Sequence, residues 1–248
     1  MIILKSLREI ERMRTSCRMV SEILCILKEN VKPGITTREL ELLAASEAKR
    51  RKAKPAFKGY HNYPSALCCS PNEQVVHGMP TDQPLESGDI LSLDFGILYD
   101  DFYGDAAITV AVGDVSVEAS NLMDATERSL YEGIEKAVPG GRLFDISHAV
   151  QKSVENRGYS VVRDFVGHGI GKSLHEDPQV PNYGTAAKGV RLKAGMVLAI
   201  EPMVNQGGYD VRVLDDNWTV VTCDGSLSAH FEHTVAITDT GPDILTRV

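Results

Sequence analysis

The chain has 248 residues, of which 43% are hydrophobic and 24% charged, and its formal net charge is −8. This composition is ordinary for a globular protein and excludes disordered and fibrous architectures. No stretch approaches the roughly eighteen consecutive apolar residues of a membrane-spanning helix, and no signal peptide is evident. We expect a single catalytic domain over residues 1–248, and a cytoplasmic location because the five cysteines include no CxxC pair and fit a reducing compartment.

The chain begins with a predicted amphipathic helix. Ser6 and Glu9 have the spacing of a capping box, in which each side chain bonds the other residue's backbone N–H. Apolar residues then recur every three or four positions over residues 7–27, which is the helical period. The helix should end before the Pro-Gly pair at residues 33–34.

A second helix is predicted directly after this Pro-Gly pair. Thr36 and Glu39 repeat the capping box, and the helix should continue towards Arg51. A basic run at residues 49–54 fits the solvated end of this helix, because cations complement the C-terminal end of the helix dipole. The same run could instead contact the ribosome or another RNA.

The second half of the chain repeats this order of elements. A helix is predicted around residues 118–137, then Pro139-Gly140, then a helix over about 144–157 that ends at Gly158. The Pro-Gly pairs at 33 and 139 are 106 residues apart. Segments 85–94 and 192–201 both run from an L-x-x-G turn through apolar residues to one carboxylate. Unless this similarity is due to chance, it indicates an internal duplication with halves of about 1–115 and 116–248.

The segment from Ile90 to Gly113 alternates like a β-hairpin with its turn near residues 99–101. This places Asp94 and Asp105 nearly opposite each other on the two strands. Like charges that face each other destabilise a pair of strands, so two such acids in apolar strands predict a compensating cation. The alternative is that one or both aspartates point to solvent.

Three further residues favour a metal site. Glu201 directly follows the apolar run 197–200, Glu232 lies just before the apolar run 235–237, and His168 is flanked by glycines. Four carboxylates and one imidazole at the edges of apolar strands are suited to two divalent cations such as Mn, Fe(II), Co or Zn. Paired metals can hold a hydroxide between them and polarise a carbonyl, so we expect hydrolysis.

Seven ordered motifs resemble those of the methionine aminopeptidases, a branch of the pita-bread metallopeptidase family. The matching stretches are residues 77–80 (HGMP), 93–95 (LDF), 104–105 (GD), 167–171 (GHGIG), 175–178 (HEDP), 200–205 (IEPMVN) and 231–234 (FEHT). The resemblance covers nearly the whole chain. It implies an α/β (α+β) pita-bread fold, with pseudo-twofold helix-helix-sheet halves around a mainly antiparallel central sheet. The short spacing between motifs resembles the compact bacterial form of the type I enzymes.

The resemblance also implies roles for individual residues. Asp94 would bind one metal, Asp105 and Glu232 would bridge both, and His168 and Glu201 would bind the other. Glu201 would also handle the proton of the water, whose hydroxide, held between the metals, attacks the first peptide carbonyl.

Two histidines complete the implied catalytic set. His77 and His175 would contact the substrate amide and stabilise the tetrahedral intermediate. From the bare sequence, either could instead be an ordinary hydrogen-bonded residue.

The implied methionine pocket consists of Tyr60, Tyr63, Cys68, Trp218, Phe57 and Leu174. Packing in an aromatic core is the alternative interpretation of these residues. Phe57 and Leu174 stand where a cysteine and a phenylalanine are common in bacterial relatives, which affects the shape of the pocket.

The function implied is removal of the initiator methionine from nascent polypeptides, with a small second residue preferred. We expect a monomer with transient ribosome contact and no DNA or membrane partner. A binding protein of the same fold without activity, and a proline-specific peptidase, are the alternatives.

Overall fold

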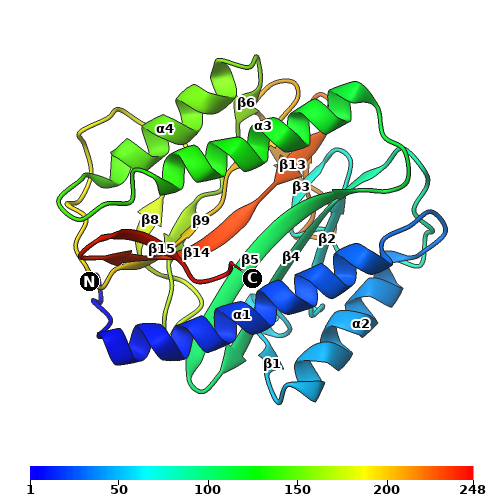
Figure 1. The fold of residues 1–248 in the computed structure, drawn as a ribbon. Helices are drawn as coiled ribbons and strands as arrows, with labels where there is room; N and C mark the ends of the chain where they lie inside the picture. The colour runs from blue at the N-terminus through cyan, green and yellow to red at the C-terminus, as the bar shows by residue number, and fades with distance from the viewer. Residues whose placement is uncertain (248) are drawn as a thin grey trace.

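The computed structural model describes residues 1–247, with helices in front of one large curled sheet in the view of Figure 1. The helices are α1 (Leu7–Asn30), α2 (Thr37–Arg50), α3 (Val117–Ile134) and α4 (Leu143–Glu155), with a short 3-10 helix at Tyr60–Asn62. The strands of the first half are β1 (Lys54–Pro55), β2 (Cys68–Pro71), β3 (Gln74–Val76), β4 (Ile90–Tyr99) and β5 (Phe102–Ala111). Those of the second half are β6 (Ser160–Val161), β7 (Gly167–Gly169), β8 (Glu176–Val180), β9 (Val197–Ile200), β10 (Met203–Asn205), β11 (Val211–Val213), β12 (Val220–Thr222), β13 (Ser228–His230), β14 (Glu232–Thr238) and β15 (Gly241–Ile244).

The first two helices begin where their capping boxes predict. The Ser6 hydroxyl accepts from the Glu9 backbone N–H at 3.3 Å, and the Glu9 carboxylate accepts from the Ser6 N–H at 2.9 Å. Thr36 and Glu39 make the same reciprocal pair at 3.1 and 2.8 Å. Each box satisfies donors that the first turn of a helix leaves unpaired.

The third and fourth helices are shorter at their C-terminal ends than predicted. The third stops at Ile134 and the fourth at Glu155, where predictions extended to Ala137 and Arg157. In both places the next residues change to the tighter i→i−3 pattern, as in the 2.9 Å bond from the Ala137 N–H to the Ile134 carbonyl. The positions of all four predicted helices are otherwise confirmed.

The predicted hairpin is confirmed, but its two aspartates do not face each other. The turn is at Asp100 and Asp101, and the ladder pairs Asp94 with Ala107 and Asp105 with Gly96. The acids are therefore diagonal neighbours. Cross-strand partners lie on the same face of a sheet, as do residues two apart, so both carboxylates still share one face.

The main sheet joins the two halves of the chain through its central strands. Its order is β1-β4-β5-β14-β9-β7-β8, with β2 and β15 pairing at β4 and β14. All of these pairings are antiparallel. The hairpin β4–β5 of the first half thus lies beside the pair β14–β9 of the second, and each pair follows two helices in the chain.

The helices bury the apolar side of the main sheet. Leu93, Phe95 and Ile97 of β4 pack with residues of α1 and α2, while Leu198 and Val235 pack with α3 and α4 in the second half. Because side chains alternate across a strand, the polar residues between these positions project from the opposite face. Among residues 1–247, no helix combines the length and hydrophobicity needed to cross a bilayer.

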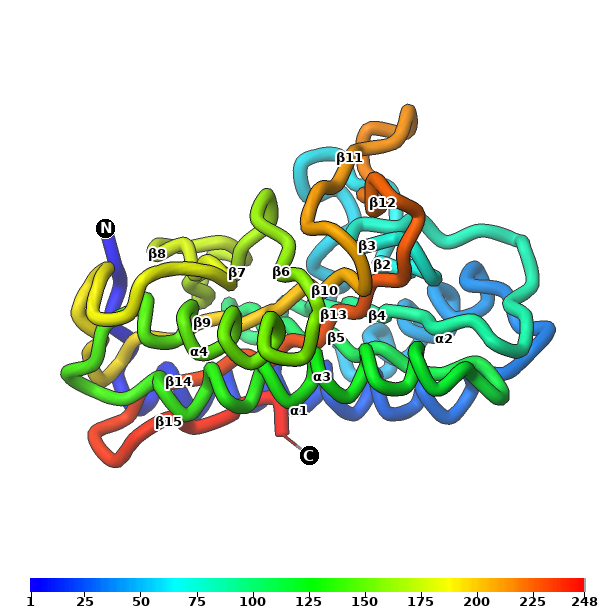
Figure 2. Tube along the Cα trace, turned by 90° about the horizontal axis from the view of Figure 1, so that it is seen from above, coloured from blue at the N-terminus to red at the C-terminus, as the bar shows by residue number. Residues whose placement is uncertain are grey.

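Two small sheets lie on that opposite side, above the main sheet in Figure 2. One has the order β13-β10-β6 and the other β11-β12-β3. They carry His230, at the end of β13, and Trp218, just before β12, to the side of the sheet that bears the acids.

Candidate metal centre and substrate cavity

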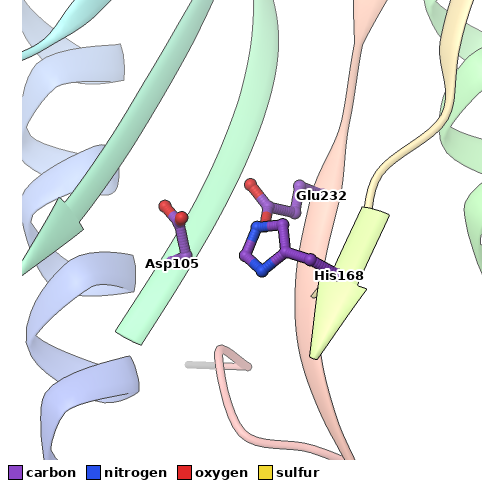
Figure 3. A group of neighbouring side chains, drawn as sticks. All are labelled: Asp105, His168 and Glu232. Carbon is purple, nitrogen blue, oxygen red and sulfur yellow. The ribbon is translucent and has the colours of Figure 1, made fainter. Parts of the chain in front are cut away.

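The predicted metal ligands come from adjacent strands of the main sheet. Asp94 lies on β4, Asp105 on β5, Glu232 on β14 and His168 on β7, and Glu201 directly follows β9. In Figure 3, the side chains of Asp105, Glu232 and His168 project from their strands into one common space. The strand order therefore gathers residues that are up to 138 positions apart in the chain.

Three of the five predicted ligands lie close enough together to share one cation. One oxygen each of Asp105 and Glu232 and one nitrogen of His168 all lie within 4.8 Å of one another. The Glu201 carboxylate is 3.5 Å from His168 Nε2. Asp105 and Glu232 are only 4% and 2% exposed, so the alternative that the aspartates point to solvent does not hold for Asp105.

Several of these carboxylate oxygens are buried without a hydrogen-bond donor. Within the described part of the chain, Asp94 Oδ1, Asp105 Oδ1 and Glu232 Oε1 have no partner. Native proteins pair nearly all buried polar atoms, so such unpaired oxygens indicate a missing ligand. A cation is the ligand that this set of donors fits.

The pKa values of the four carboxyl groups also fit a cation-binding site. Burial raises the pKa of Asp94 to about 7. Burial and the nearby acids also raise the pKa values of Asp105, Glu201 and Glu232 well above their ordinary range. Each of these four carboxyl groups is hard to ionise while the others are close by. A divalent cation would offset their negative charges, so together they would form a strong cation-binding site.

His168 is held in its neutral form. Burial, followed by neighbouring His175, lowers the pKa of His168 to about 3, and its Nδ1 lies 2.9 Å from the Gly169 carbonyl oxygen. A neutral ring that donates from Nδ1 leaves Nε2 with a free lone pair that could bind a cation.

The acids form one wall of an open cavity of about 780 Å³, a volume that includes the solvent-filled space at its mouth. The structure brings all thirteen predicted site residues to this cavity: Phe57, Tyr60, Tyr63, Cys68, His77, Asp94, Asp105, His168, Leu174, His175, Glu201, Trp218 and Glu232. Phe57, Tyr63, Cys68 and Leu174 belong to one buried apolar cluster, with Tyr60 and Trp218 packed against it. The aromatic residues thus pack in a core and line the cavity at the same time.

The cavity walls are tied together by polar and aromatic contacts. The Tyr63 hydroxyl donates to the Gly78 carbonyl at 3.0 Å, and its ring lies edge-on to Trp218 at 5.1 Å. At the exposed mouth, the Tyr60 hydroxyl lies 2.7 Å from His175 Nδ1. The His175 ring centroid is 4.2 Å from that of His168, so this histidine lies directly beside the acid cluster.

The structure also places at the site residues for which no role was predicted from the sequence. His230 is buried, and its Nε2 lies 3.7 Å from a Glu201 oxygen. Phe165 lines the cavity and stacks edge-on against His77 at 5.4 Å between centroids. His230 stands two positions before Glu232, a spacing that could have drawn attention to it, but Phe165 carries no comparable signal.

Comparisons with known proteins agree with this geometry. Residues 11–239 match the model of metallopeptidase family M24. A methionine aminopeptidase of Clostridium perfringens is 54% identical over 248 residues, with all of both chains covered. Crystal structures of methionine aminopeptidases from Rickettsia prowazekii and Thermotoga maritima match all of this chain and of their own, with TM-scores of 0.99 and 0.98 at 40% and 47% identity.

These matches confirm the predicted fold class and the resemblance on which it rested. The mixed α/β architecture with its curled antiparallel sheet is shared with both solved structures over their full length. The family model covers most of the chain, including all five predicted metal ligands. The chain belongs to metallopeptidase family M24.

Proposed function

We propose that the chain removes the initiator methionine from nascent polypeptides. Its family and its relatives at high identity make it a hydrolase of the aminopeptidase type. The observation that carries the proposal is the junction of two surfaces in one cavity, where a buried acid cluster meets an apolar pocket of aromatic and sulfur groups. The relatives with this fold bear the name methionine aminopeptidase, which supports the same substrate.

Two divalent cations would be held by Asp94, Asp105, His168, Glu201 and Glu232. The unpaired buried oxygens and the raised pKa values of the carboxyls support this assignment. When bound, such cations supply Lewis-acid activation of a water and of a carbonyl oxygen. Co, Mn, Fe(II) and Zn all suit the donor set.

Glu201 is the residue that we assign to proton transfer. Its carboxylate lies at the cavity wall, 14% exposed, between His168 Nε2 at 3.5 Å and His230 Nε2 at 3.7 Å. Burial, together with Asp94, raises the pKa of Glu201, which makes it a better acceptor for the proton of the attacking water. The Glu201 carboxylate would then transfer this proton to the leaving amine.

His77 and His175 would donate hydrogen bonds to the substrate carbonyl and amide. Burial lowers the pKa of His77 to about 4, so its ring is neutral at pH 7 and acts as an N–H donor. In His175, Nδ1 already has the Tyr60 hydroxyl as its partner, which leaves Nε2 free for the substrate. Donors placed where charge develops stabilise the tetrahedral intermediate.

The pocket of Tyr60, Tyr63, Cys68, Trp218, Phe57 and Leu174 would hold the methionine side chain. A flexible thioether packs well against aromatic and sulfur groups. With the acids holding their two cations, a free α-amine would find beside this pocket a Lewis-acidic partner that a blocked N-terminus could not use, which supports exopeptidase action. Phe57 and Leu174 would set the local shape of this pocket.

The remaining partners follow from the same proposal. Nascent chains are made in the cytoplasm, and the five free cysteines of the structure fit a reducing compartment. Ribosome contact through residues 49–54 stays a prediction. Within this run, Arg51 already forms ion pairs with Glu47 and Glu22, which partly neutralise its charge. The monomeric state and the preference for a small second residue also stay predictions.

The test is release of free methionine from Met-Ala-Ser by chelator-treated protein, with each metal added back singly. We expect release that depends on metal, no release from N-acetyl-Met-Ala-Ser, and slower release from Met-Leu-Ser. Cleavage of an Xaa-Pro dipeptide in preference to Met-Ala-Ser would favour the proline-specific alternative. A folded, metal-loaded sample without activity on any of these peptides would overturn the proposal.

A further inference from the structure

Residues 1–6, which we call the N-terminal strap, cross the edge of the main sheet beside β8 before α1 begins (Figure 2). Within the strap, Lys5 is almost completely buried. Its Nζ donates to Glu176 Oε2 at 2.6 Å, and the two side chains are only 4% and 7% exposed. A buried ion pair 171 residues apart in sequence is an unusual way to fasten a chain terminus, because both charges must be desolvated.

Glu176 connects the strap to the loop that carries His175. Its second oxygen, Oε1, accepts from the backbone N–H of Ser173 at 3.2 Å. The carboxylate therefore bonds Lys5 on one side and the loop on the other. His175 lies inside this closed turn, directly before Glu176.

The strap and the loop are also closely packed against each other. A Cβ atom placed on Gly171 would lie 2.6 Å from both Glu176 Oε1 and Lys5 Cε. The Lys5 backbone N–H donates to the Gly195 carbonyl at 2.7 Å, and a Cβ on Gly195 would lie 2.8 Å from the Lys5 carbonyl oxygen. The Lys5 backbone is thus held against Gly195, which limits the movement of its ammonium group. The close packing around Gly171 limits the movement of the Glu176 carboxylate.

We infer that Lys5 is a positioning residue for the reaction, acting on His175 through Glu176. The inference rests on the proposed function, in which His175 donates to the substrate. Without the Lys5 ammonium, a buried carboxylate would lose its cation and would turn towards solvent. That turn would release the Ser173 N–H and shift the neighbouring histidine, whose ring lies 4.2 Å from His168.

The test begins with Lys5→Met, which keeps an unbranched side chain and removes the charge. We expect kcat for Met-Ala-Ser to fall at least about tenfold, because a small misplacement of a catalytic group is enough for such a loss. Metal content should stay unchanged, since Lys5 and Glu176 are not metal ligands, and KM should change less than kcat, although Leu174 of the pocket lies in the same loop. The control is Arg14→Met, which breaks the 2.7 Å pair between α1 and Asp243 far from this loop and should keep kcat.

Two double variants separate positioning from a general loss of structure. In the His175→Ala background, Lys5→Met should cause no further fall in kcat, because its effect passes through the histidine. Combining Lys5→Met with Glu176→Gln should recover part of kcat, because the neutral amide oxygen can still accept from Ser173. An equal loss in the His175→Ala background, or no recovery with Glu176→Gln, would overturn the inference, as would normal kcat in Lys5→Met.

Amide hydrogen exchange keeps this test separate from the proposed function. Lys5→Met should speed the exchange of the Ser173 amide relative to wild type, whereas Arg14→Met should not. If wild type releases no methionine, the proposed function fails and this exchange measurement alone decides whether the strap holds the loop. Unchanged exchange at Ser173 would show that it does not.

Discussion

Replacing Asp94 by asparagine should stabilise the metal-free protein while removing its ability to bind metal productively. The side chain keeps its shape but loses its charge. In the folded protein, burial raises the pKa of Asp94 from an ordinary 3.8 to about 7. The folded state therefore disfavours the ionised carboxylate, and this destabilisation develops as the pH rises from about 4 to 7 and is complete above pH 7.

The magnitude follows from the same pair of values. The difference between 3.8 and about 7 corresponds to about 4 kcal/mol. Because Asp94 keeps some solvent contact at the cavity wall, we expect about 2 to 4 kcal/mol in practice. In a chain of this size that is a rise in Tm of about 5 to 10 °C.

The assay is thermal unfolding of chelator-treated wild type and Asp94→Asn between pH 8 and pH 4. The variant should melt higher at pH 8, and the gap should close towards pH 4. Adding Mn or Co should then reverse the order, because a cation that binds the folded state stabilises wild type more than the variant. The control is Asp82→Asn, an exposed change of the same charge, which should leave Tm unaltered at both pH values. A metal-free Asp94→Asn protein that melts at or below wild type at pH 8 would refute the reasoning.

Three other predictions concern the metal centre and the scaffold. Asp105→Asn should keep the fold, as judged by circular dichroism, but lose metal by elemental analysis and lose activity; near-normal turnover would contradict the two-metal assignment. His175→Ala should retain its metal and lose about 100-fold in kcat, the usual effect of removing one oxyanion donor; loss of metal instead would mean that the role of the histidine is misassigned. Thr36→Ala, which removes a capping box remote from the cavity, should lower the free energy of unfolding by about 1 kcal/mol with kcat unchanged, as measured by urea titration and peptide hydrolysis.

Local features of this protein were predictable from sequence. Both capping boxes are contacts between residues three positions apart, so their spacing alone locates the starts of α1 and α2. The turn at Asp100-Asp101 and the strands on either side of it likewise depend on neighbours in the chain. The candidate metal ligands stood out because a carboxylate in an apolar strand requires a compensating partner, whatever the fold around it.

Long-range arrangement was settled by tertiary structure. Placing β14 between β5 and β9 brings Glu232 to Asp105, and the pairing of β9 with β7 brings His168 to the same site. Such pairings depend on packing between distant segments, and no local period encodes them. The 3.7 Å approach of His230 to Glu201 has the same origin.

The helices, the hairpin and the chemical character of the site were thus predictable without the fold, because each depends on residue type and near neighbours. Which side chains surround the reacting groups, and which contacts hold them there, depends on the folding of distant segments against one another. Lys5 shows the difference most clearly: in sequence it is one lysine before a helix, and it becomes part of the site because folding buries it against Glu176. A buried charge needs a partner, and the fold alone determines which residue that partner is.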